Sequence, residues 1–157
     1  MLLIFKTMKG LRFGDLAEIY GYGLREEAEF YHYLRSVFFK TTGAMYCIWE
    51  EHGQYCSALR LEPFADGLVL AGLETEPAHR RRGWGTALVR SVLKQVDVPV
   101  YAHVHHANAP SIALHKKCGF RKIKDTATLL DGTTTAHYAT YCYGAMDTLR
   151  ACQSGFI

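Results

Sequence analysis

The stretch that decides the fold reads Thr75-Glu-Pro-Ala-His-Arg80-Arg-Arg-Gly83-Trp-Gly85-Thr86. The apolar run Leu68–Leu73 precedes it, and apolar residues at helical spacing follow it. This order predicts a strand, a glycine-bearing turn and the start of a helix. Such a turn suits an anion, because glycines let the backbone approach a ligand and a helix start offers free N–H groups at its positive end.

The turn differs from two other phosphate-binding motifs. No Gly-Lys-Ser/Thr follows it, as a P-loop requires, and Leu88 stands where a dinucleotide fingerprint needs a third glycine. The net charge of the chain is only +3, so Arg80, Arg81 and Arg82 favour a small polyanion over a nucleic acid. Two alternatives stay open: a structural turn with a solvated basic face, and a nucleic-acid binder with steeply salt-dependent affinity.

The composition predicts one globular domain that spans residues 1–157. Hydrophobic residues make up 49% of the chain and charged residues 21%, which excludes a disordered chain. The 5 cysteines are widely spaced without a C-x-x-C pair, so we expect reduced thiols, no zinc site and a cytoplasmic location. No apolar run is long enough to span a bilayer, and we expect no membrane partner.

Periodicity and turn signals predict the order β-α-α-β-β-β-α-β-α-β-β, which indicates an α/β or α+β fold. Strands are expected at 2–6, 44–49, 55–61, 68–75, 100–104, 120–130 and 134–143, and the fourth is expected to be a buried central strand. Hairpin turns are expected at Glu51-His-Gly-Gln54 and, between the last two strands, at Asp131-Gly132. Helices are expected at 13–22, at 25–39, from the glycine turn to about 96, and at 109–117, with a short tail after residue 144.

A second motif links the strand at 100–104 to a short helix and reads Asn108-Ala-Pro-Ser111-Ile-Ala-Leu-His115-Lys-Lys-Cys-Gly-Phe120. Asn108 precedes the helix, where its side chain can cap the N-terminus and still offer its amide to a ligand. A cap with no further role is the alternative. His115 lies on the helix, where a lone histidine is more often a surface or packing residue than a catalyst.

Together, the two motifs resemble those of the GNAT superfamily of acetyl-CoA-dependent N-acetyltransferases. In that family a Gln/Arg-x-x-Gly-x-Gly/Ala loop follows the fourth strand, and Arg80–Gly85 matches it. The later family pattern Asn-x-x-Ala/Ser-x-x-Leu-Tyr-x-Lys-x-Gly-Phe is matched at Asn108, Ser111, Leu114, Lys117, Gly119 and Phe120. The resemblance implies a mixed, mostly antiparallel central sheet of about six to seven strands, flanked by four helices.

The resemblance also implies acetyl-CoA as co-substrate. In such enzymes the strand before the turn binds the pantetheine arm through its backbone, and one N–H group polarises the thioester carbonyl. The turn binds the pyrophosphate, and Asn108 braces the arm. The implied cofactor-binding residues are Leu73, Thr75, Arg80, Arg81, Arg82, Gly83, Trp84, Gly85, Thr86, Asn108 and Ser111.

Direct attack of an amine on the thioester is implied, with no enzyme nucleophile. Glu74 is the candidate base because it lies on the strand edge next to the thioester, and Glu76 is the second candidate. An ion pair with a nearby arginine or histidine is the alternative role for Glu74. The family tyrosine that protonates the leaving thiolate is replaced here by His115, whose imidazolium can donate that proton. Alternatively, His115 is a spacer and water protonates the thiolate.

The first two helices and the last hairpin build the acceptor pocket in this family. Their aromatic side chains suit a flat or cationic acceptor, or belong to the core. These residues are Tyr20, Tyr22, Tyr31, His32, Tyr33, Tyr138 and Tyr141. His103 and His105 share a face of their strand and either line the pocket or are partly exposed. A metal site formed by His103, His105 and His106 would lack a nearby carboxylate or cysteine ligand, so no metal is expected.

The sequence therefore predicts an acetyl-CoA-dependent N-acetyltransferase that acetylates a primary amine of a small molecule or peptide. The acceptor is the expected partner, with no nucleic acid, and an exposed last strand allows a homodimer. The alternative is a non-catalytic acyl-CoA sensor or interaction module on the same fold, which His115 at the tyrosine position motivates.

Overall fold

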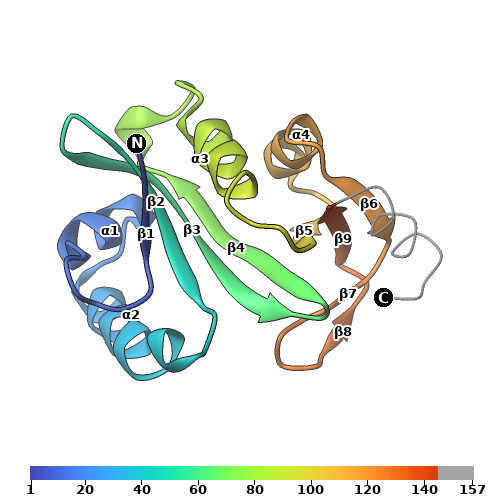
Figure 1. Ribbon diagram of the computed structural model, residues 1–157, viewed down its shortest axis with the longest axis horizontal. Helices are drawn as coiled ribbons and strands as arrows, with labels where there is room; N and C mark the ends of the chain where they lie inside the picture. Colours follow the sequence, from blue (N-terminus) through green and yellow to red (C-terminus); the bar gives the residue numbers. More distant parts are fainter. Residues whose placement is uncertain (145–157) are drawn as a thin grey trace. The chain divides into compact units, whose positions relative to one another are not determined.

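The computed structural model describes residues 1–144, and the tail expected after residue 144 lies outside the described residues. Within that range the chain forms four α-helices, a seven-stranded sheet in the order β1-β2-β3-β4-β5-β9-β6, and a two-stranded sheet of β7 and β8 (Figure 1). The large sheet is mixed and mostly antiparallel, so the predicted fold class is confirmed. The chain divides into two compact units: Met1–Glu62 with Gly72–Val92, and Pro63–Ala71 with the chain from Leu93 onward.

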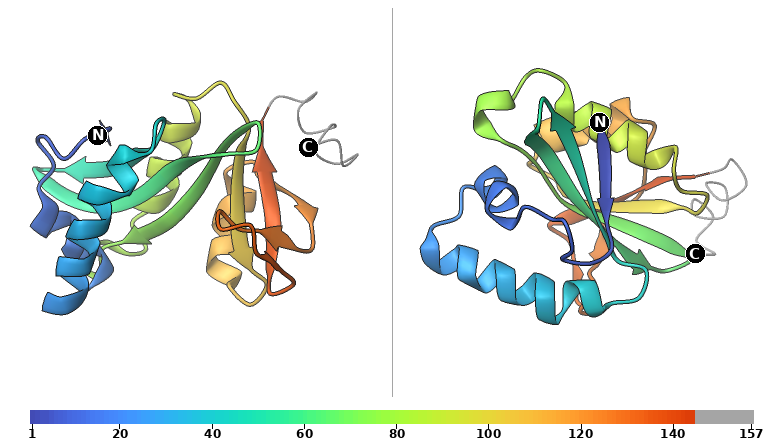
Figure 2. Two further views of the ribbon diagram at one scale, coloured as in Figure 1. Left: turned by 90° about the horizontal axis from the view of Figure 1, so that it is seen from below. Right: turned by 60° about the vertical axis from the view of Figure 1, so that its left-hand side comes forward.

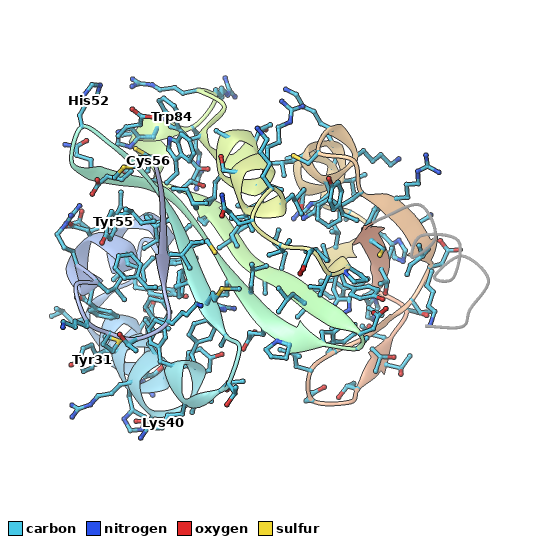
Figure 3. The ribbon with its side chains drawn as sticks, viewed as in Figure 1. Tyr31, Lys40, His52, Tyr55, Cys56 and Trp84 are labelled. Carbon is cyan, nitrogen blue, oxygen red and sulfur yellow. The ribbon has the colours of Figure 1, made fainter. Side chains whose placement is uncertain are left out.

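The first unit is built on an antiparallel run of strands. β1 (Leu2–Phe5) pairs with β2 (Met45–Glu51), which pairs in turn with β3 (Gln54–Phe64). The turn between β2 and β3 contains His52 (φ 49°) and Gly53 (φ 77°), and Figure 3 shows His52 at its tip. Two successive residues of positive φ match the right-handed twist of paired strands, so the hairpin expected here is confirmed.

Two helices, α1 (Phe13–Tyr20) and α2 (Leu24–Ser36), cover one face of these strands, and a short 3-10 helix, η1 (Phe38–Lys40), follows (Figure 2). The core on this face includes Leu16, Ile19, Phe30, Leu34, Phe38, Tyr46 and Ile48. The predicted helix 25–39 is wrong at its end, because Val37 leaves helical geometry (φ −124°, ψ −63°) and Phe38 then turns into the core.

Strand β4 (Gly67–Thr75) begins in the second unit and enters the first at Gly72, whose φ of 61° is left-handed. The 3-10 helix η2 (Pro77–His79) and α3 (Trp84–Leu93) follow it. Figure 2 shows α3 on the opposite face of β1–β3 from α1 and α2. The expected central position of β4 in the sheet is confirmed, but the expectation that it is buried is wrong, since only Val69 and Leu70 are buried. An apolar run in the sequence does not show how fully other elements will cover the strand. The end of β4 remains partly exposed, so a ligand can reach it.

The second unit contains the remaining strands and α4 (Ala109–Lys117). β5 (Val100–His105) pairs parallel with β4 and antiparallel with β9 (Tyr138–Tyr143), which also pairs with β6 (Arg121–Lys124). Its core includes Val69, Phe64, Tyr101, Ile123 and Cys142. No helix among the described residues is both long and apolar enough to cross a membrane.

The last predicted hairpin forms, but its strands are shorter than expected. β6 ends at Lys124 after a register shift between Lys122 and Lys124. The chain then pairs again as β7 (Ala127–Thr128) and β8 (Thr134–Thr135) around the predicted turn, where Gly132 has φ 84°. The shift occurs where Ile123 packs against the core, which no local sequence pattern indicates.

Candidate active site

The turn between β4 and α3 contains two residues in left-handed conformation. Arg81 (φ 64°) and Gly83 (φ 78°) are both left-handed. Left-handed residues are common in turns whose N–H groups form a concave site for an anion. The first turn of α3, with Gly85 and Thr86, adds N–H groups that have no intrahelical partner. A Cβ at Gly83 would meet no atom within 4 Å, so the backbone conformation rather than space favours glycine here.

The three arginines of this turn are exposed and have different surroundings. Arg80 folds back on β4, where its Nη2 lies 3.2 Å from Oε1 of Glu74 and its Nε donates to the Thr75 carbonyl at 3.2 Å. Arg81 and Arg82 form no ion pair with any residue from 1 to 144. Their charges, together with the free N–H groups at the start of α3, suit a pyrophosphate.

Trp84 is the first residue of α3, and its side chain packs within the first unit (Figure 3). Its ring stacks on that of Trp49, with the centroids 6.5 Å apart and an angle of 21° between the planes. Its Nε1 is buried and has no hydrogen-bond partner among the described residues. The ring therefore anchors the start of α3.

The end of β4 carries the expected thioester site and the candidate base. Leu73 and Thr75 are half-buried. The buried Ser57 on β3 donates to the Glu74 carbonyl at 2.9 Å and hydrogen-bonds Thr75 Oγ1 at 3.2 Å, which fixes this end of the strand. The Glu74 side chain is 41% exposed and forms the ion pair with Arg80. The structure thus shows the ion-pair role of Glu74, and a role as base requires Arg80 to release it.

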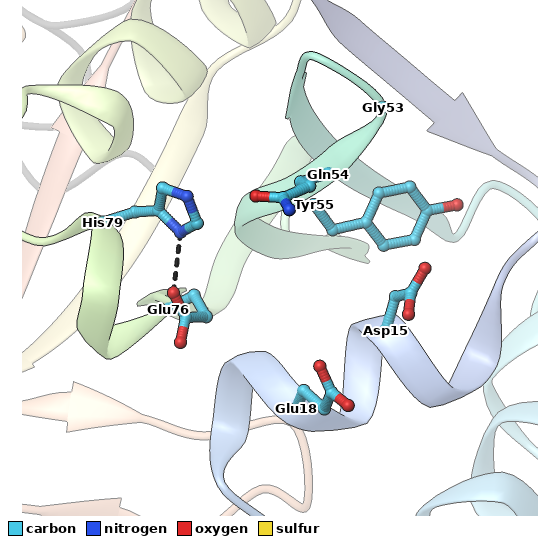
Figure 4. Close-up of a pocket in the computed structure, with 7 residues that line it drawn as sticks. All are labelled: Asp15, Glu18, Gly53, Gln54, Tyr55, Glu76 and His79. Carbon is cyan, nitrogen blue, oxygen red and sulfur yellow. Dashed lines mark hydrogen bonds and ion pairs between the residues drawn. The ribbon is translucent and has the colours of Figure 1, made fainter.

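A pocket of about 290 Å³ lies beside the residues that follow β4 (Figure 4). Its lining residues come from α1, the start of β3 and η2 with the residue before it. They are Asp15, Glu18, Gly53, Gln54, Tyr55, Glu76 and His79. Sequence reasoning missed this pocket because it joins three separate segments, and no spacing within one segment indicates it.

The pocket wall is acidic. His79 Nδ1 lies 2.6 Å from Glu76 Oε2, which also accepts the N–H of Ala78 at 3.0 Å. Asp15 pairs with Arg12 at 2.6 Å, whereas Glu18 forms no ion pair within residues 1–144. Carboxylates around one cavity attract a cationic amine. Glu76, the second candidate base, lies in this wall.

The residues expected from the second motif lie together in the second unit. The side-chain oxygen of Asn108 accepts the N–H of Ser111 at 3.2 Å, which confirms the predicted cap of α4. Ser111 in turn contacts His115, since its carbonyl oxygen lies 2.7 Å and its Oγ 3.2 Å from His115 Nδ1. The predicted site residues therefore form two groups, residues 73–86 in the first unit and residues 108–115 in the second.

His115 is 2% exposed, and its ring packs edge-on against Phe120. Because Nδ1 faces a carbonyl oxygen, we assign the proton of the neutral ring to Nδ1 and the lone pair to Nε2. Nε2 is buried with no hydrogen-bond partner among the described residues. Burial lowers the pKa of His115, and the hydrogen bond to Ser111 opposes this effect. Donation of a proton from Nε2 therefore needs an imidazolium that burial disfavours.

We expect the protein to lose stability as the pH falls below about 6.5. Burial lowers the pKa of both His115 and His103, so the unfolded chain binds protons that the folded chain does not. This contribution is complete above the pKa of the unfolded histidines and is lost progressively below it. Urea titrations at several pH values measure the slope of the unfolding free energy. His115→Tyr should reduce this slope and leave the part due to His103, whereas an unchanged slope would contradict the assignment.

The helix aromatics expected at an acceptor pocket lie in the first unit. Tyr20 and Tyr22 stack with their centroids 5.4 Å apart. Tyr31 is exposed on α2 and packs edge-on against Phe13 (Figure 3). His32 is also exposed, and Tyr33 is half-buried.

The strand residues of the same set lie in the second unit. Tyr141 is buried in the core and Tyr138 is half-buried. His103 packs edge-on against Phe64 at 5.1 Å, and His105 is exposed. Within residues 1–144, no three histidine, cysteine or carboxylate side chains are grouped as a metal site would require.

Residues 12–120 match the Acetyltransferase (GNAT) family, and the chain belongs to this family. No curated protein matches the chain. Three solved structures show the shared fold. The N-acetyltransferase PseH from Campylobacter jejuni, in complex with acetyl coenzyme A, has a TM-score of 0.69 at 12% identity over 92% of this chain and 99% of that one.

An aminoglycoside 6'-N-acetyltransferase complexed with coenzyme A has a TM-score of 0.63 at 12% identity, over 91% of this chain and 96% of that one. The ribosomal-protein-S18-alanine N-acetyltransferase from Escherichia coli has a TM-score of 0.58 at 16% identity, over 90% of this chain and 91% of that one. The fold is therefore that of N-acetyltransferases whose names include an aminoglycoside and an alanine of ribosomal protein S18 as acceptors.

Proposed function

We propose that the chain is an acetyl-CoA-dependent N-acetyltransferase that acetylates a primary amine of a small molecule or peptide. The observation that carries this proposal is the turn between β4 and α3, with its left-handed Arg81 and Gly83 and with Arg81 and Arg82, which form no ion pair within residues 1–144. The sequence of this turn, after the fourth strand, matches the Gln/Arg-x-x-Gly-x-Gly/Ala loop motif of the family to which the chain belongs, and this match supports the proposal. Family members of the same fold that were solved with coenzyme A or acetyl coenzyme A support it.

Acetyl-CoA supplies an activated acetyl thioester, and the residues of the chain bind and orient it. The turn from Arg80 to Thr86 binds the pyrophosphate through N–H groups and guanidinium groups. The backbone of Leu73 and Thr75 binds the pantetheine arm, with Asn108 and Ser111 as further contacts. An N–H group of β4 stabilises the negative charge that develops on the carbonyl oxygen.

The acceptor amine must lose a proton to attack the carbonyl carbon. Glu74 accepts this proton, directly or through water, once its carboxylate is free of Arg80. A pyrophosphate in the turn competes with Glu74 for the Arg80 guanidinium, so cofactor binding itself frees the base. The attack forms the C–N bond, the C–S bond breaks, and the departing thiolate takes its proton from His115 or from water.

Calorimetry with acetyl-CoA is the first test of this function. We expect binding in the micromolar range, and turnover with at least one amine in a screen that detects the released thiol. Absence of binding at millimolar acetyl-CoA would exclude the proposal. The screen should include amino acids, polyamines, aminoglycosides and peptide N-termini.

A non-catalytic acyl-CoA sensor is the second candidate function. The observation that favours it is the state of His115, whose buried Nε2 carries a lone pair where the family has a tyrosine hydroxyl. A sensor would bind acetyl-CoA and release no thiol with any amine of the panel. Rapid thiol release would exclude it.

A further inference from the structure

Arg60 on β3 places a cation beneath the helices of the first unit. Ala58 belongs to the core under α1 and α2, and the alternation of a strand puts Arg60 on the same face. The Arg60 side chain is half-buried, and its Nε is buried with no hydrogen-bond partner among the described residues. No carboxylate of residues 1–144 lies within 4.0 Å of its guanidinium nitrogens.

Tyr46 lies opposite Arg60 in the β2–β3 register, and the hydroxyls of Tyr46, Tyr20 and Tyr33 lie close enough to interact electrostatically with the guanidinium. Burial raises the pKa of Tyr46 to about 12 and that of Tyr20 well above its ordinary value, so both are uncharged at neutral pH. Tyr20 donates to the Gly72 carbonyl at 2.7 Å, and therefore accepts from Tyr46 at 2.6 Å. The hydroxyls solvate the cation of Arg60 without neutralising it, and an unpaired charge that is partly desolvated favours a bound anion.

Glu62 is the acid closest to Arg60 on the same face of β3, two residues further along the strand. Its side chain accepts a hydrogen bond from the Tyr33 hydroxyl at 3.4 Å, and it does not form an ion pair with Arg60 within the described residues. Within the described residues, Arg60 therefore pairs directly with no carboxylate. The Glu62 carboxylate contacts the Tyr33 hydroxyl and not the guanidinium.

The guanidinium also lies against β4 next to the expected thioester position. A Cβ at Gly72 would lie 2.9 Å from Nη1 and 3.0 Å from Cζ of Arg60, so the guanidinium packs over the bare Cα. The next residue is Leu73, whose backbone binds the pantetheine arm in the proposed function. Neighbouring Cα atoms are about 3.8 Å apart. An anion bound to Arg60 would therefore lie close to an amine that attacks the thioester beside Leu73.

We propose that Arg60 binds a carboxylate of the acceptor, so that the acceptor is an amine with a carboxylate close to it, as in an amino acid. A guanidinium presents paired donors that match the two oxygens of a carboxylate. Arg60 is then a specificity-determining residue on the α1 and α2 face, and this role rests on the proposed function.

The test compares matched acceptors, each amino acid against its own carboxamide. The wild-type protein should prefer the carboxylate form by about tenfold or more in kcat/KM. Arg60→Met should remove this preference and change turnover of the carboxamides much less, and Arg60→Lys should keep part of it because the charge remains. Arg25→Met, which removes an exposed arginine of α2, is the matched control and should keep the full preference.

The measured preferences test the role of Arg60 separately from the proposed acetyltransferase function. Equal use of both forms by the wild type, or an undiminished preference in Arg60→Met, would overturn the role of Arg60. A uniform loss for all acceptors in both Arg60 variants would also overturn it, since it would show that Arg60 only supports β4 at Gly72. Failure of the proposed function would be seen separately, as the absence of acetyl-CoA binding and of thiol release with any amine.

Discussion

Gly83→Glu is expected to lower the affinity for acetyl-CoA by about 100-fold or more, which corresponds to about 2.8 kcal/mol. The new carboxylate would extend into the open space beside the turn and repel the pyrophosphate from the N–H groups that face it. A side chain at φ 78° also costs about 1–2 kcal/mol, which favours a shift of the turn away from its anion-binding conformation. Isothermal calorimetry with acetyl-CoA measures the loss.

Gly132→Glu is the matched control for this experiment. Gly132 has φ 84°, and a Cβ there would also meet no atom within 4 Å. It lies in the turn between β7 and β8, so the control adds the same strain and charge without a change near α3. We expect wild-type affinity in the control and similar thermal unfolding of the two variants by circular dichroism. Equal acetyl-CoA affinity of both variants would show that the turn after β4 is not the pyrophosphate site.

Much of the fold follows from patterns that are local in the chain. The glycines at 83 and 85, the cap at Asn108 and the turn at His52 and Gly53 are each decided by a few neighbouring residues, and the structure has the predicted element at each. The end of α2 was not predictable in this way, because Val37 ends the helix so that Phe38 can enter the core. The register shift beside Ile123 has the same origin in tertiary packing.

In the candidate site, too, features decided by neighbouring residues were predicted and features decided by tertiary structure were not. The turn after β4 was predicted because its glycines and arginines are adjacent in sequence, although no glycine marks the left-handed position of Arg81. The acidic pocket was missed because Glu18 and Glu76 come from distant segments. Arg60 was missed because a charged residue in a strand indicates an exposed position, whereas the fold places it among tyrosines. Sequence thus points to the donor site, and tertiary structure is needed to find groups that could recognise an acceptor.

Glu74→Gln is expected to lower kcat by about 100-fold. The affinity for acetyl-CoA should not fall and should rise slightly, because Arg80 no longer has Glu74 as an ion-pair partner that competes with the pyrophosphate. Glutamine keeps the size of the side chain and removes its ability to accept a proton. The backbone of residue 74, held by Ser57 at 2.9 Å, should remain in place, so cofactor binding is preserved. Turnover of the variant should recover at high pH, where the free amine forms without a base. Steady-state thiol release across a pH series, together with calorimetry, measures both effects.

Glu76→Gln is the matched control, since it removes a second carboxylate two residues away. Glu76 lines the acidic pocket and is bonded to His79 at 2.6 Å, so its loss should weaken binding of a cationic acceptor and raise KM more than it lowers kcat. A large loss of kcat in Glu76→Gln with normal kcat in Glu74→Gln would instead place the base in the pocket wall, where the imidazole of His79 can pass the proton on. Normal kcat in both variants would exclude both carboxylates and leave proton removal to water.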